Sequence, residues 1–130
     1  MRIVVLADIQ TDHPGDYEER ALRLAMAEQP DLVLLAGDYI HLGRRSRSYA
    51  AEGQALNVLM QSVGLDAPLG VYAVQGNVDE SGAWTAIFAG LPVTMFETMS
   101  QVDIGPVVLT ALGMWDAFDA HKVIAAQDKF

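Results

Sequence analysis

The chain has 130 residues, which suits one small domain with a single hydrophobic core and excludes two independent domains. Its residues are 52% hydrophobic, which excludes a disordered chain, but no apolar run approaches the roughly 18 to 20 positions that a membrane span needs, so we expect a soluble protein. The formal net charge of −9 would repel a nucleic-acid backbone and speaks against general DNA or RNA binding.

The first predicted element is a strand over Arg2–Ala7, because this run is continuously aliphatic and β-branched. Such runs are typical of strands that are covered on both faces of a parallel sheet. The run meets Asp8 too early to form the apolar part of a secretory signal peptide, so we expect a cytoplasmic protein.

Two helices and a second strand follow along the chain. Helical spacing of apolar residues predicts a helix over Asp16–Glu28, with Asp16 as its N-cap and Glu19 as the partner in a capping box. A second buried strand is predicted over Leu32–Ala36, and a second helix over Tyr49–Val63.

A third buried strand is predicted over Gly70–Val74, followed by a short helix over Gly82–Leu91. Strands that alternate with helices predict the α/β class: a βαβαβ arrangement with right-handed crossovers and a mostly parallel sheet.

The alternation of strands and helices ends at Pro92. Residues 93–112 predict two or three short strands in antiparallel hairpins, and the stretch from Asp116 to Phe130 predicts a C-terminal helix that reaches at least Gln127.

Polar side chains end each of the three strongest strands. Asp8 and Gln10 follow the first, Asp38 the second and Asn77 the third. Asp8 and Asp38 are 30 residues apart, and Asp38 and Asn77 are 39 apart, each about the length of one βαβ unit. Because the carboxyl ends of parallel strands meet at one edge of a sheet, we expect Asp8, Asp38 and Asn77 to lie close together.

Carboxylate and amide oxygens that converge in this way favour a divalent cation, which relieves their repulsion. The chain has no cysteine, so a metal must be held by oxygen or imidazole. Taken one at a time, an aspartate at a strand end also fits a turn or a helix cap.

Three short sequence motifs make the metal-site interpretation more specific. DIQ at 8–10, GDY at 37–39 and GNVD at 76–79 resemble the first three motifs of the calcineurin-like metallophosphoesterases, D-x-H, G-D-x and G-N-H-[DE]. The resemblance implies layers of sheet and helix around a two-metal site, where a metal-activated water hydrolyses a phosphate mono- or diester. It further implies that Asp38 bridges the two ions, that Asp8 and Gln10 bind the first, and that Asn77 binds the second.

Two residues depart from the family motifs. Gln10 replaces a histidine, and its amide oxygen favours Mn²⁺ or Mg²⁺ over Zn²⁺ or Fe. Val78 replaces the histidine of G-N-H, and valine can neither donate a proton to a leaving group nor stabilise charge.

The remaining ligands of the family are histidines in Gly-His contexts, and none of the three histidines in this sequence has that context. We therefore expect residues 1–130 to form one metallophosphoesterase-like domain that lacks its C-terminal half. Such a domain exposes a sheet edge and an apolar face, which predicts self-association or a complementing partner.

Arg44 and Arg45 follow the second motif in the stretch 41–48, and Arg47 lies near them. A guanidinium binds phosphate through two hydrogen bonds, so Arg44 and Arg45 are candidate ligands of a phosphorylated small-molecule substrate, although a solvated loop explains them equally well.

The main functional hypothesis is a metal-dependent phosphoesterase with Asp38 and Asn77 at its catalytic centre. The alternative is a non-catalytic, metal- or phosphate-binding regulatory domain with a degenerate site. A nucleotide-binding domain is a third possibility, which the lack of a glycine-rich first turn disfavours.

Overall fold

A computed structural model describes residues 1–125 of the chain. Its centre is a sheet of four parallel strands whose order in space is their order along the chain. The strands are β1 (Ile3–Leu6), β2 (Leu32–Leu35), β3 (Val71–Val74) and β4 (Val93–Phe96). The predicted α/β class and its parallel sheet are confirmed.

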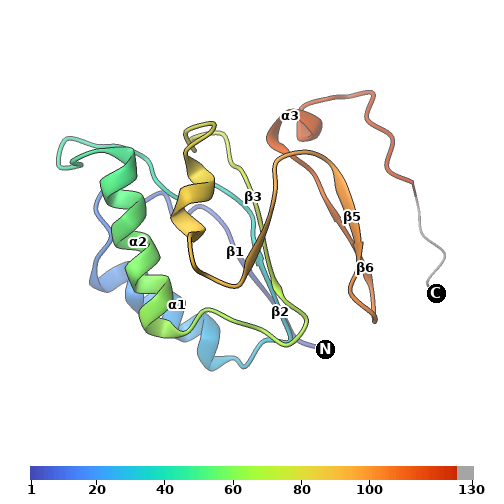
Figure 1. The fold of residues 1–130 in the computed structure, drawn as a ribbon, viewed down its shortest axis with the longest axis horizontal. Coiled ribbons are helices and arrows are strands. Elements are labelled where there is room, and N and C mark those ends of the chain that lie inside the picture. The colour runs from blue at the N-terminus through green and yellow to red at the C-terminus, as the bar shows by residue number, and fades with distance from the viewer. Residues whose placement is uncertain (126–130) are drawn as a thin grey trace.

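Three helical segments connect these strands: α1 (Asp16–Ala27), α2 (Tyr49–Val63) and the 3₁₀ helix η1 (Trp84–Phe88). Right-handed crossovers between strands that follow one another in the sheet place every connection on the same face. Figure 1 shows α1 and α2 together on that side of the sheet.

The core lies between these helices and the sheet. Tyr39, Trp84 and Phe88 are fully buried there, and the rings of Tyr39 and Trp84 stack with centroids 6.2 Å apart. The hydroxyl of Tyr39 lies 3.0 Å from the carbonyl oxygen of Leu35 and 2.8 Å from that of Val74 and shares its one hydrogen between them, so its polar atom is satisfied between two strands. This core supports the ends of β2 and β3, where the predicted site residues begin.

The opposite face of the sheet is bare over β1. Side chains on this face form the row Val5, Leu34, Tyr72 and Thr94 across the four strands. Val5 is 58% exposed and Ile3, two residues before it on β1, is 43% exposed. The prediction that the first strand is covered on both faces is therefore wrong for the part of the chain that the structure describes.

The strands after Pro92 divide between two sheets. β5 (Ser100–Asp103) and β6 (Val108–Ala111) form the expected antiparallel hairpin. β4 instead pairs in parallel with β3, beginning with Val93 opposite Val71, so the hairpin prediction is wrong for this strand. The short η1 brings the chain back across the sheet, which makes a further parallel pairing possible.

The predicted C-terminal helix is the largest correction. Helix α3 covers only Met114–Ala117, residues 118–125 are not helical, and the remainder of the prediction lies outside the described residues. Trp115 and Phe118 are mostly exposed. A helix gains most of its stability from packing an apolar face, and here these side chains have little surface to pack against.

Helix α1 begins at Asp16 as predicted, but its capping residues differ from the prediction: the capping-box partner is Glu18 and not Glu19. Gly15, not Asp16, is the N-cap, and its backbone N–H donates to the carboxylate of Glu18 at 2.8 Å. In residues 1–125, no helix combines the length and the apolar character that crossing a membrane requires.

Candidate metal centre at the carboxyl edge of the parallel sheet

The loops after β1 and β2 are joined by backbone hydrogen bonds. The N–H of Asp8 donates to the carbonyl of Gly37 at 3.3 Å, and the N–H of Gln10 donates to the carbonyl of Asp38 at 2.8 Å. The pairing of the two strands thus continues beyond their regular ends. This continuation brings the first two predicted motifs side by side.

The loops after β2 and β3 approach each other even more closely. A Cβ atom on Gly37 would lie 2.5 Å from the backbone nitrogen of Gly76, and Gly37 has φ +92°. A Cβ atom on Gly76 would lie 2.2 Å from the backbone nitrogen of Asp38. Only glycine fits at these two positions, which explains why both motifs begin with it.

A buried carboxylate, that of Asp79, connects the same two loops. It accepts hydrogen bonds from the backbone N–H groups of Asp38 at 2.8 Å, Tyr39 at 2.7 Å and Gly76 at 2.8 Å. Asp79 is the last residue of the GNVD motif, and the sequence pattern predicted no role for it. Its position two residues after Asn77, in a turn that follows a buried strand, was the available signal.

Backbone strain is concentrated at the predicted ligands. Four non-glycine residues in the described chain have a positive φ, and three of them are Asp8 (+53°), Gln10 (+40°) and Asp38 (+59°). This left-handed conformation is unfavourable for residues with a Cβ atom and is enriched at functional sites, where the surrounding structure holds it in place.

Asp38 and Asn77 line one open pocket of about 190 Å³, together with Gly76 and, from the far side, Met114 and Phe118. The Oδ1 atom of Asp38 also accepts a hydrogen bond from the backbone N–H of Val78 at 3.0 Å. The second and third motifs therefore present their polar side chains to a common space.

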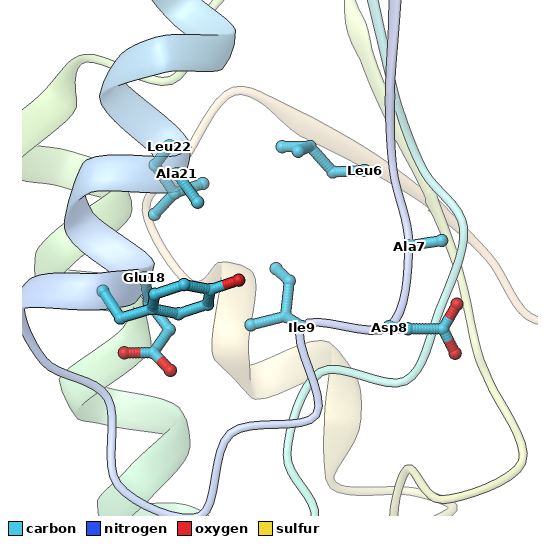
Figure 2. A pocket seen from close by; sticks show the side chains of 8 residues that line it. Leu6, Ala7, Asp8, Ile9, Glu18, Ala21 and Leu22 are labelled. Atoms are coloured by element: carbon cyan, nitrogen blue, oxygen red, sulfur yellow. The ribbon is translucent and has the colours of Figure 1, made fainter.

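Asp8 lines a different cavity. This cavity has a volume of about 130 Å³, lies between β1 and α1, and is bordered by apolar side chains that include Leu6, Ile9 and Leu22. Figure 2 shows the carboxylate of Asp8 directed away from the side chains of Ile9, Ala21 and Leu22. Gln10 is exposed and lines neither cavity. The structure thus brings the three loops together, but it places only Asp38 and Asn77 in the same pocket.

The chemistry of these residues fits a hard divalent cation. Across residues 1–125, no three His, Cys, Asp or Glu side chains are grouped so that they could hold a metal ion. The four predicted ligands instead offer two carboxylates and two carboxamides, which are oxygen donors of the kind that Mg²⁺ and Mn²⁺ accept. Gly76 leaves the space beside Oδ1 of Asp38 free of any side chain.

Two tyrosines lie behind the pocket in their protonated form. Burial, and secondarily the charge of Asp79, raises the pKa of both Tyr39 and Tyr49 well above the ordinary value. The Tyr49 hydroxyl lies 3.3 Å from Oδ1 of Asp79 and donates a hydrogen bond to it. The hydroxyl groups of these side chains therefore stay protonated at neutral pH and act as hydrogen-bond donors to the loops.

The three arginines after the second motif have different environments. Arg47 is held by Glu52, whose carboxylate is fully buried and accepts hydrogen bonds from the backbone and the guanidinium of Arg47. These bonds from Arg47 lower the pKa of Glu52 to about 2. Arg44 and Arg45 are exposed, and Arg45 lies 3.9 Å from the carboxylate of Asp12. Only these two remain available to a ligand.

Comparison with known proteins identifies a family. A family model described as calcineurin-like phosphoesterase matches residues 1–123. No curated protein matches the chain.

Proposed function

Because the chain belongs to the calcineurin-like phosphoesterase family, whose members generally use divalent metals, we propose that it is a metal-dependent hydrolase of a phosphate mono- or diester. The observation that carries the proposal is the common pocket of Asp38 and Asn77, at the edge where the motif loops are joined. Backbone hydrogen bonds join the first loop to the second, and the Asp79 carboxylate joins the second to the third. Ligands of open parallel sheets bind at this edge.

The residues that would hold the divalent ions are Asp38 and Asn77, which share the pocket, together with Asp8 and Gln10 from the adjoining loop after β1. Asp38 would be the ligand common to both ions. Mn²⁺ or Mg²⁺ is preferred over Zn²⁺ or Fe because all four donors are oxygen atoms. When bound, the ions would supply Lewis acidity and a water acidic enough to be a nucleophile at neutral pH. Arg44 and Arg45 lie on the loop after the second motif and would bind the phosphate group of a small-molecule substrate.

Val78 restricts the reaction. Its backbone N–H donates to Asp38, but its side chain cannot protonate a leaving oxygen. We therefore expect the best substrates to have leaving groups that depart without a proton, such as an aryl phosphate with an acidic phenol.

The alternative function is a regulatory domain that binds a metal or a phosphate and does not catalyse hydrolysis. Val78 favours it, and so does the lack of a cluster of three His, Cys, Asp or Glu side chains within residues 1–125. A domain of this kind would bind one ion weakly and would not turn over an ester.

The test is an Mn²⁺ titration by calorimetry, combined with the turnover of an aryl phosphate. If the chain is an enzyme, we expect two coupled Mn²⁺ sites. We also expect Asp38→Asn to lower turnover at least about tenfold, which equals roughly 1.4 kcal/mol in activation free energy. Asp66→Asn is the control, since Asp66 lies before β3 at the opposite end of the sheet. Turnover that is unchanged in Asp38→Asn at saturating Mn²⁺ would refute the role of Asp38.

A further inference from the structure

We propose that Asp79 is the positioning residue of the candidate metal centre, in that its buried carboxylate sets where Asp38 and Asn77 lie; this inference rests on the proposed function. Asp79 is 5% exposed and does not line the pocket of Asp38 and Asn77. It acts through the backbone of the two loops that carry these residues.

One oxygen atom joins the two loops. Oδ2 of Asp79 accepts the N–H of Asp38 and the N–H of Gly76, each at 2.8 Å. Since Gly76 immediately precedes Asn77, this atom determines the separation between the loops that present the two pocket side chains. The glycines at 37 and 76 permit the close approach, and Asp79 holds it.

The other oxygen maintains the strained conformation of Asp38. Oδ1 of Asp79 accepts the N–H of Tyr39 at 2.7 Å and the hydroxyl of Tyr49 at 3.3 Å. Consecutive backbone N–H groups that converge on one anion form a concave site, as in the anion-binding nests of other proteins. Here the anion is internal, and it stabilises the left-handed φ of +59° that Asp38 adopts.

The direction of the Asp38 carboxylate depends on the same arrangement. Its Oδ1 accepts the N–H of Val78, which belongs to the loop that Asp79 joins to the loop after β2. If the loops separate, Asp38 loses both the support of its backbone and the donor that orients its side chain. A polar group that orients metal ligands typically changes metal affinity by about 10- to 100-fold when it is removed.

Position 79 requires a carboxylate because all of its partners donate. An asparagine side chain has one acceptor atom, and its NH₂ group would face the N–H groups that one carboxylate oxygen now accepts. Asp79→Asn is therefore a change of small volume that breaks the connection at one of the two oxygens.

Hydrogen exchange provides the first test, with the metal-free full chain. The amides of Asp38, Tyr39 and Gly76 should exchange more slowly in the wild type than in an unstructured peptide. In Asp79→Asn they should lose most of this protection, while the amides of β2 and β3 keep theirs. Wild-type amides that exchange at the peptide rate would overturn the proposal, whatever the variant does.

Metal affinity provides the second test. We expect Asp79→Asn to weaken Mn²⁺ binding at least about tenfold in calorimetry. The control is Asn57→Ala, because Asn57 is equally buried and donates to the carbonyls of Ile87 and Ala89, so its loss destabilises η1 without touching either loop. Asn57→Ala should retain Mn²⁺ affinity at a similar loss of stability.

Equal Mn²⁺ affinity in Asp79→Asn and the wild type would overturn the positioning role, and so would an equal loss in Asn57→Ala. A wild-type chain that binds no Mn²⁺ would instead refute the proposed function. The exchange rates of the three amides would then still decide whether Asp79 holds the loops.

Discussion

Gly76 lies so close to Asp38 that a Cβ atom on Gly76 would be 2.1 Å from Oδ1 of the Asp38 carboxylate and 2.2 Å from its backbone nitrogen. The second of these atoms belongs to the backbone and cannot rotate away. The second and third motifs are therefore in direct contact, and this contact can be tested separately from any reaction.

Gly76→Ala should lower the free energy of unfolding by about 1 to 3 kcal/mol, because the new methyl group forces the two loops apart. It should also weaken Mn²⁺ binding, since the separation moves Asp38 relative to Asn77. Urea unfolding and calorimetry measure the two effects. Gly15→Ala is the control for metal binding, because the nearest atom to its Cβ would be 3.9 Å away and no motif loop is displaced. Gly15 is the N-cap of α1, so its replacement by alanine should cost up to about 1 kcal/mol of stability but leave Mn²⁺ affinity unchanged.

Replacing Arg44 and Arg45 together by alanine should raise KM for an aryl phosphate roughly fivefold, which corresponds to about 1 kcal/mol, with kcat nearly unchanged. Both side chains are exposed and would contribute to binding more than to the reaction itself. Steady-state kinetics at low salt measure this change. Arg20→Ala, on the exposed surface of α1, should leave KM as it is; a KM that the double variant does not alter would contradict a substrate role.

Acid should destabilise the chain through Glu52. Its folded-state pKa of about 2 lies below the ordinary 4.5, so the stabilisation is complete above about pH 4.5 and is lost as the pH falls toward 2. Glu52→Gln should be less stable at neutral pH and should show a flatter dependence of stability on pH in this range. Urea unfolding at several pH values tests this, with the exposed Glu28→Gln as a control that keeps the wild-type slope.

The bare face of the sheet should make the chain associate with itself. Val5 is 58% exposed on β1, which is an edge strand with backbone groups available for a further strand. Val5→Lys should therefore shift the mass measured by light scattering toward the monomer. Val58→Lys is the control, because Val58 is 53% exposed on α2, away from the sheet. A single sharp monomer peak for the wild-type chain in light scattering would contradict this prediction.

Local patterns in the sequence determined the alternating part of the fold. The helix over Tyr49–Val63 agrees with the prediction at both ends, and Ser48 and Gly64 cap it there. The strands β1, β2 and β3 were each located to within a residue or two. Hydrophobic periodicity and capping residues act over a few positions, so they can be read without knowing what packs against them.

The sequence by itself also determined that polar residues end three parallel strands, and hence that Asp8, Asp38 and Asn77 lie along one edge of the sheet. Only the tertiary structure decided that Asp38 and Asn77 share a pocket, that Asp79 fastens their loops, and that β4 joins β3. The physical reason is range: strands and helices arise from neighbours in the chain, whereas the partners of the Asp79 carboxylate include Asp38 and Tyr39, about 40 residues away, and become neighbours only when the sheet forms.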